Sequence, residues 1–128
     1  MKTNKTVYDT RFFAESFYSN DESTLKKIRR HKALERYISA VVIHEVYRLA
    51  LSREGREVAK IKVTNIKKTF KVVPIDDQIA QLSAEFRHKY QLSMGDSMIA
   101  ATASTLNAVC ITDDPHFKQI KEIQTEWI

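Results

Sequence analysis

The residues of this chain best placed to do chemistry are acidic residues at the edges of apolar segments, or inside them. They are Asp9, Glu45, Asp96 and the pair Asp113/Asp114. Apolar surroundings penalise a charged carboxylate, so each such side chain must be solvated, cap a helix or bind a cation. If one fold brought these positions together, the carboxylates would repel each other unless a hard divalent metal neutralised them. The sequence therefore predicts a metal-dependent hydrolase.

Most of these acidic residues also have a simpler structural explanation. Asp9 follows a short apolar run and could cap the helix expected after it, so capping and metal binding are equally compatible with its position. Asp114 precedes Pro115, and proline favours the first position of a helix, which makes Asp114 a good N-cap. Ser93 and Asp96 have the spacing of a capping box, with aspartate in place of glutamate. None of these three positions indicates a metal site by itself.

Glu45 is the hardest of the acidic residues to explain as a structural residue. It lies in the middle of an expected helix, and its neighbours on one face are Val42, Val46 and Leu49. A glutamate on such a face needs a partner. Arg48, one turn further along, could supply an ion pair. A role as a metal ligand or as a base is at least as compatible with this position.

The elements that must position these residues alternate between strands and helices. Short apolar segments predict strands at residues 5–9, 36–39, 71–75, 108–111 and 123–128. Helical spacing of apolar residues predicts helices at residues 10–19, 25–35, 40–52, 58–70, 76–90, 94–106 and 115–120. Such alternation predicts a three-layer α/β/α sandwich with a mainly parallel central sheet. In that architecture ligands bind beyond the carboxyl ends of the strands, where Asp9 and Asp113/Asp114 fall.

Length and composition agree with this architecture. We expect 128 residues to form one domain, and 43% hydrophobic with 29% charged residues is typical of a globular chain. The single cysteine, Cys110, excludes an intrachain disulfide and is best explained as a small buried hydrophobe. No segment resembles a signal peptide or a membrane span, so we expect a soluble, cytoplasmic protein. No histidine has zinc-type spacing to Cys110 or to another histidine, which favours oxygen ligands for any metal.

The basic residues are concentrated in the first half of the chain. Residues 1–71 carry 17 basic and 8 acidic side chains, a net charge of +9, whereas residues 72–128 carry 4 and 8, a net charge of −4. A dense group in the first half consists of Lys26, Lys27, Arg29 and Arg30. Any single member could simply be a solvated side chain. Together with an acidic metal site, however, the basic half favours a phosphodiester substrate, whose flanking phosphates it would hold.

Four stretches of the sequence, taken in order, carry a resemblance to a known family. They are Asp9-Thr10 after a strand, Glu45 six residues after Ser39, DSMIAATA at residues 96–103 and ITDDPHF at residues 111–117. In this order and spacing they resemble the PIN-domain ribonucleases over nearly the whole chain. Within that family the chain is most similar to the VapC-type toxins of VapBC toxin–antitoxin pairs.

The resemblance implies a role for each of these residues. The catalytic set would be Asp9, Glu45, Asp96 and Asp114; Asp9, Asp96 and Asp114 would hold Mg²⁺ or Mn²⁺, and Thr10, Thr112 and Asp113 would support them. Arg11 stands where many such toxins have a serine, and it would contact an RNA phosphate or the carboxylates of the metal site. The implied reaction is cleavage of single-stranded or loop RNA by a metal-activated water, leaving 5′-phosphate ends. The implied partners are a small antitoxin protein and a second copy of the chain.

Other functions remain compatible with the sequence. A phosphoacceptor receiver domain shares the alternating architecture, but it needs an acidic pair near the first strand and a lysine where Thr112-Asp113 stands. A catalytically silent PIN-like module that binds RNA or protein is harder to exclude, because Arg11 is unusual. A housekeeping PIN nuclease that processes RNA would carry the same acidic residues as a toxin. Metal-dependent cleavage would separate the enzymes from the silent module.

Overall fold

A computed structural model describes residues 3–128, which form five strands and seven helices. The strands are β1 (Lys5–Tyr8), β2 (Glu35–Ser39), β3 (Lys71–Val73), β4 (Val109–Ile111) and β5 (Gln124–Glu126). The helices are α1 (Thr10–Tyr18), α2 (Glu22–Arg30), α3 (Ala40–Glu54), α4 (Arg56–Thr69), α5 (Asp77–Tyr90), α6 (Met94–Leu106) and α7 (Pro115–Lys118).

The strands form one parallel sheet in the order β3-β2-β1-β4-β5. The first strand is therefore central, and it pairs with β2 on one side and β4 on the other. Its last residue, Tyr8, lies opposite Ile111, the last residue of β4. Because both strands run in the same direction, Asp9 and Thr112 leave the sheet side by side at its carboxyl edge. The backbone N–H of Asp9 donates to the carbonyl of Ile111 at 3.1 Å.

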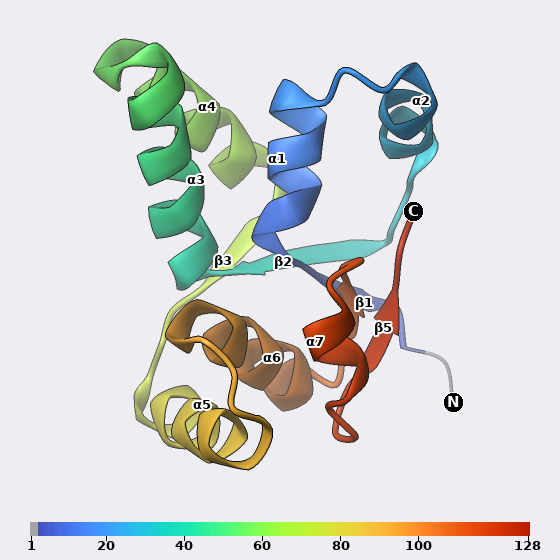
Figure 1. Cartoon of the computed structure of the whole chain (residues 1–128), viewed down its shortest axis with the longest axis vertical. Coiled ribbons are helices and arrows are strands. Elements are labelled where there is room, and N and C mark those ends of the chain that lie inside the picture. The colour runs from blue at the N-terminus through green and yellow to red at the C-terminus, as the bar shows by residue number, and fades with distance from the viewer. Residues whose placement is uncertain (1–2) are drawn as a thin grey trace.

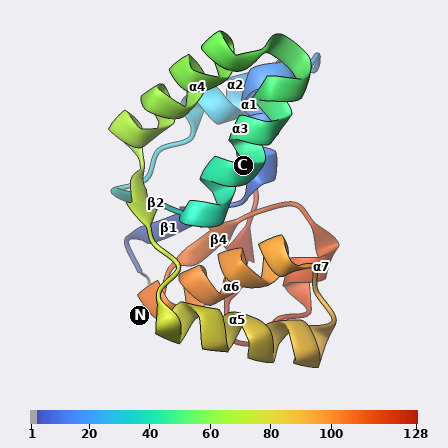
Figure 2. The ribbon, with the colours of Figure 1, turned by 90° about the vertical axis from the view of Figure 1, so that its left-hand side faces the viewer.

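Helices cover both faces of the sheet (Figures 1 and 2). The first four helices lie on one face, and α5, α6 and α7 lie on the other. The amino-terminal parts of α1 and α3 approach the carboxyl edge of the sheet, directly after β1 and β2. This arrangement confirms the predicted α/β/α sandwich with a parallel sheet.

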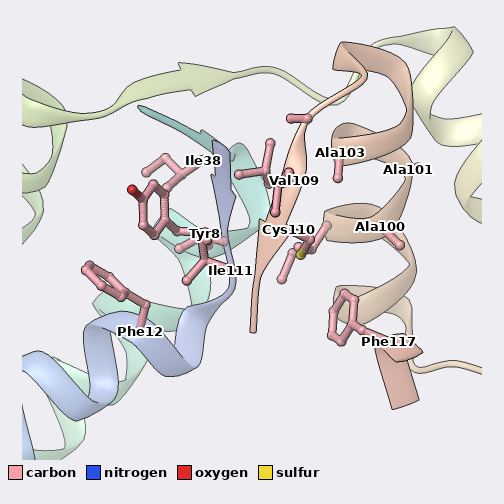
Figure 3. Close-up of a cluster of buried hydrophobic side chains, with 14 of the residues drawn as sticks. Tyr8, Phe12, Ile38, Ala100, Ala101, Ala103, Val109, Cys110, Ile111 and Phe117 are labelled. Carbon is pink, nitrogen blue, oxygen red and sulfur yellow. The ribbon is translucent and has the colours of Figure 1, made fainter. Parts of the chain in front are cut away.

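The core has a cluster of aromatic side chains on one face of the sheet, and the small side chains of α6 together with Phe117 of α7 on the other (Figure 3). Tyr8 packs on Phe12 and on Phe70, with ring centroids 4.7 and 5.0 Å apart. On the opposite face the alanines of α6 let that helix approach β4 closely, next to Cys110. Cys110 is fully buried, as predicted, and burial raises the pKa of its thiol. The thiol therefore stays protonated and acts as a small apolar group.

The predicted elements are all present, but several boundaries differ. The second helix spans Glu22–Arg30, so its predicted extension to residue 35 is wrong. Residue 35 instead begins β2, where Glu35 pairs with Lys5 of β1. The last strand ends at Glu126, so Trp127, predicted to lie on it, falls just outside. Pro74, directly after β3, has no backbone N–H to donate to a neighbouring strand, and β3 lies at an edge of the sheet. No helix within residues 3–128 is long and apolar enough to cross a membrane.

Candidate active site

Asp9 lies at the end of β1 and is 3% exposed. It occupies the N-cap position of α1, but its side chain does not cap that helix. Instead, its Oδ2 accepts a hydrogen bond of 2.7 Å from the hydroxyl of Thr112, which follows β4. The predicted support of Asp9 by Thr112 is therefore present. The capping explanation of Asp9 is wrong, and its carboxylate is available for another ligand.

Asp96 and Asp114 approach each other from the two ends of the α6–β4 unit. Asp96 lies in the first turn of α6, whose N-cap, Ser93, accepts a hydrogen bond from the backbone N–H of Asp96. Asp114 caps α7 by accepting from the backbone N–H of His116 at 2.9 Å. Ligand atoms of Asp96, Asp114 and His116 nevertheless lie within 4.8 Å of one another. Asp114 therefore caps α7 and also lies close enough to Asp96 to share a metal ion with it.

Glu45 reaches the same site from α3. Its Oε1 accepts a hydrogen bond of 2.5 Å from the hydroxyl of Thr10, the first residue of α1. Its Oε2 lies against Gly95, where a Cβ atom would approach to 2.6 Å. Among residues 3–128, Glu45 makes no ion pair with Arg48. The ion pair with Arg48, which would have explained Glu45 as a structural residue, is therefore absent from the described part of the chain. The hydroxyl of Thr10 supports Glu45 instead, as predicted for Thr10.

We name Asp9, Glu45, Asp96 and Asp114 the acidic cluster. Burial raises the pKa of Asp9 from 3.8 to about 6; the Thr112 hydrogen bond opposes this rise, and the charges of Asp96 and Asp114 add to it. Burial also raises the pKa of Asp96, and the charges of Asp114 and Glu45 raise it further. The charges of Asp96 and Asp114 act on Asp9, and the charges of Asp114 and Glu45 act on Asp96, so Asp96 is close to the other three members of the cluster.

The chemistry of the acidic cluster suits a hard divalent cation. Its donors are carboxylate oxygens, which are the ligands that Mg²⁺ and Mn²⁺ prefer. No ion pair within the described part of the chain joins a lysine or arginine to a member of the cluster. Within residues 3–128, the basic side chain that contacts a member of the cluster directly is His116, whose Nδ1 lies 2.8 Å from Oδ1 of Asp114. A bound cation would supply the positive charge that these side chains otherwise lack.

Asp113 and Arg11 form a pair beside the acidic cluster. The guanidinium of Arg11 donates from Nε and Nη2 to the two carboxylate oxygens of Asp113. Arg11 also lies 3.9 Å from Glu15 and is half exposed. The predicted contact of Arg11 with a carboxylate is therefore present, although its partner is Asp113 rather than a member of the cluster.

The predicted RNA-binding residues of α2 lie away from the acidic cluster. Lys26, Lys27, Arg29 and Arg30 are on a helix that has no buried residue. That helix follows the carboxyl end of α1, whereas the acidic cluster is at the amino end of α1 (Figure 1). These four residues can contact a substrate only at a distance from the cluster.

Sequence reasoning missed two residues that the structure brings to the site. His116 was not assigned a role, although it follows Asp114 by two residues in the first turn of α7. Gly95 was not assigned a role either, because the space that a side chain there would need is taken by Glu45, which is 50 positions earlier in the sequence. The only available signal for Gly95 was that a helix rarely places a glycine in its first turn without a reason.

Gly95→Ala should lower activity without lowering stability. The new methyl group would push the Glu45 carboxylate away from its bond to Thr10, and small displacements of a reacting group can cost up to roughly 100-fold in rate. Because Gly95 lies in a helix, alanine favours folding there by roughly 0.5–1 kcal/mol. We expect at least a roughly tenfold lower kcat with an unchanged or higher melting temperature.

Gly55→Ala is the matched control for this substitution. Gly55 separates α3 from α4 with a φ of +87°, a conformation that alanine adopts only under strain, and a Cβ there would meet nothing within 4 Å. This variant should lower the melting temperature and leave kcat unchanged. Equal kcat values for Gly95→Ala and wild type would show that Glu45 needs no fixed position.

This chain resembles known proteins both in sequence pattern and in fold. The family model of the PIN domain matches residues 6–123. DNA-bound VapBC from Salmonella typhimurium is similar in fold, with a TM-score of 0.79 and 20% identity over 96% of this chain and 97% of the other. VapBC2 from Rickettsia felis, bound to a promoter DNA fragment, has a TM-score of 0.78 and 16% identity over 97% and 98% of the two chains.

A third similar structure is VapC20 from Mycobacterium tuberculosis, described as a toxin that cleaves the sarcin-ricin loop. Its TM-score is 0.76, with 18% identity over 93% of this chain and 98% of the other. Among curated protein sequences, none matches the chain. The family match nevertheless covers the acidic cluster in full, from Asp9 to Asp114. The chain therefore belongs to the PIN-domain family.

Proposed function

We propose that this protein is a metal-dependent endoribonuclease, the toxin of a toxin–antitoxin pair. The observation that carries the proposal is the convergence of four carboxylates on one pocket without a lysine or arginine bound to any of them within residues 3–128. Such a pocket is costly for the folded protein unless it binds a cation. The PIN fold and the similarity to VapC-type structures support RNA as the substrate.

In this proposal the acidic cluster divides into two roles. Asp9, Asp96 and Asp114 hold Mg²⁺ or Mn²⁺, and Glu45, fixed by Thr10, orients the attacking water. The chemistry that the bound metal supplies is polarisation of the scissile phosphate and a lower pKa for the attacking water. Thr112 keeps the Asp9 carboxylate in place, and Arg11 with Asp113 borders the pocket. Cleavage leaves a 5′-phosphate end.

The proposed protein partners are a small antitoxin and a second copy of this chain. The similar structures include toxin–antitoxin complexes, which supports an antitoxin here. An antitoxin could block the site by placing a basic side chain among the carboxylates, where it would take the position of the metal charge.

A silent module that binds RNA without cutting it is the second candidate function. The unusual residue Arg11, engaged with Asp113 at the border of the pocket, is the observation that favours it. The two candidates differ in one measurement, cleavage in the presence of metal.

The proposed activity predicts metal-dependent cleavage of single-stranded RNA. Purified protein should cut a labelled RNA that contains unpaired loops when Mg²⁺ or Mn²⁺ is present, and EDTA should stop the reaction. The new ends should be ligatable as 5′-phosphates. Binding without cleavage in both metals would contradict the nuclease and favour the silent module. Cleavage that persists in EDTA would contradict the metal site.

The basic residues of α2 should contribute to RNA affinity without contributing to the chemical step. Replacing Lys26, Lys27, Arg29 and Arg30 with Gln should raise KM and leave kcat unchanged. The dependence of log affinity on log salt should fall by roughly 0.7 for each lost contact with a single-strand phosphate. Affinity measured over a series of salt concentrations tests this. An unchanged slope would assign the α2 residues to a solvated face or to antitoxin binding.

A further inference from the structure

A groove leads away from the acidic cluster between α1 and α3. It has a volume of about 430 Å³, and its lining begins at Thr10 and Glu45. The remaining lining residues all come from one face of α3: His44, Arg48, Leu49 and Ser52. Both ends of the Thr10–Glu45 hydrogen bond therefore border the groove. A molecule in it would be in direct contact with the acidic cluster.

A second, smaller groove continues the first in the direction of the carboxyl end of α3. Its volume is about 180 Å³, and Leu49 lines both grooves. Tyr18 and Arg53 form its far end, with the Arg53 guanidinium 4.6 Å from the centre of the Tyr18 ring. Helices α1 and α3, which carry these residues, lie side by side (Figure 1). The two cavities are neighbours that share Leu49, and we name them together the α1–α3 groove.

The groove is suited to an anionic chain. Arg48 and Arg53 are exposed, and neither forms an ion pair within residues 3–128, so both guanidiniums are available to a ligand. A guanidinium binds a phosphate through two parallel hydrogen bonds. The one acidic side chain of the smaller groove, Glu15, lies 3.9 Å from Arg11, which partly offsets its charge.

The spacing of the arginines along α3 matches a chain that passes the acidic cluster. Arg48 is three residues beyond Glu45, about 4.5 Å along the helix axis, and Arg53 is eight residues beyond, about 12 Å. Arg53 lies over the Tyr18 ring, and Nζ of Lys62 lies 4.5 Å from the centre of the same ring. An unpaired base at this point would therefore stack on the guanidinium of Arg53, which Tyr18 holds in place. A polyanion with bases explains this combination better than an acidic peptide does.

We propose that the α1–α3 groove binds the single-stranded RNA on one side of the scissile bond. Arg48 contacts the phosphate next to the one that is cut, and Arg53 with Tyr18 holds the following nucleotide. This assignment rests on the proposed nuclease function, and it gives the substrate a direction across the site. The groove starts at the acidic cluster and ends at Tyr18, the last residue of α1, whereas the basic residues of α2 lie beyond that end.

The test measures binding separately from cleavage. Arg48→Gln and Arg53→Gln, singly and together, are placed in the Asp96→Asn protein and titrated with a short fluorescein-labelled single-stranded RNA of mixed sequence. Each single change should weaken binding roughly tenfold, the loss expected for one hydrogen bond to a charged group. It should also reduce the salt slope by roughly 0.7. Arg48→Lys, which keeps the charge, should retain most of the slope.

Arg87→Gln is the matched control, because Arg87 is an exposed arginine of α5 on the opposite face of the sheet. It should bind RNA as the parent does, and melting temperatures should show that every variant is folded. In protein with an intact Asp96, the arginine variants should raise KM more than they lower kcat.

The outcomes distinguish this proposal from the nuclease proposal. If the double variant keeps the parent affinity and salt slope, the groove assignment is overturned, and the groove is left to a protein partner. If binding depends on Arg48 and Arg53 but wild-type protein cuts no RNA, the groove assignment stands and the nuclease fails. If the wild-type protein binds no single-stranded RNA at all, both proposals are overturned.

Discussion

Asp96→Asn should reduce RNA cleavage by roughly 100-fold or more, the range seen when one group that stabilises transition-state charge is removed. Burial raises the pKa of Asp96, and the charges of the nearby Asp114 and Glu45 raise it further. Asparagine keeps the size of the side chain but removes the charge that would attract a divalent metal. Single-turnover cleavage at saturating Mg²⁺ measures the effect.

The same substitution should leave the fold intact. Ser93 caps α6 through the backbone N–H of Asp96, so this hydrogen bond survives in the variant. Loss of a negative charge at a helix N-terminus costs about 0.3–1 kcal/mol, and relief of the repulsion within the cluster offsets this cost. We expect a free energy of unfolding within about 1 kcal/mol of wild type.

Asp77→Asn is the matched control for Asp96→Asn. Asp77 occupies the corresponding first turn of α5 and is exposed. It carries the same helix-terminus effect without any contact with the cluster, so cleavage should stay at the wild-type rate. Equal losses in the two variants would indicate a general effect on folding and would remove Asp96 from the proposed metal site.

Most of the fold could be predicted because the apolar pattern is local. The alanine-rich α6 begins and ends at the predicted residues, since its small side chains and its cap are read directly from adjacent positions. The residue at which α2 ends could not be predicted from adjacent positions. Its basic sequence favours a helix beyond Arg30, but His31 bonds to the hydroxyl of Tyr8 and Glu35 pairs with Lys5. Contacts with a distant strand overrode the local preference there.

The acidic site was predictable as a set of residues but not as a set of contacts. Whether Asp9 caps a helix or faces a pocket depends on Thr112, 103 positions away. The partner of Glu45 is Thr10, 35 positions earlier, rather than the neighbouring Arg48. The need for Gly95 appears only when Glu45 is placed against it. Local spacing cannot distinguish these alternatives, because each is decided by which strand ends meet at the sheet edge.

Asp9→Asn should stabilise the metal-free protein at neutral pH while it abolishes metal binding. Burial raises the pKa of Asp9 to about 6 in the folded state, above its ordinary value of 3.8. The protonated form is therefore favoured by folding, and the stability it provides is complete below pH 4 and lost as the pH rises through about 6. The shift corresponds to roughly 3 kcal/mol at neutral pH. The raised pKa of Asp96 acts in the same direction.

Chemical denaturation of metal-free protein between pH 4 and pH 7.5 tests this expectation. Wild type and Asp77→Asn should lose stability as the pH rises through about 6, whereas Asp9→Asn should follow a flatter profile and be the most stable of the three at neutral pH. Mg²⁺ or Mn²⁺ should then restore wild type and leave Asp9→Asn unchanged, because a ligand stabilises only the folded state that binds it. A wild-type profile without a decline up to about pH 6 would mean that Asp9 is not the buried carboxylate with a raised pKa described here. A decline that metal does not reverse would place the cation elsewhere. If both expectations hold, the ionised carboxylate of Asp9 destabilises the metal-free protein, and metal binding to that same charge restores the stability.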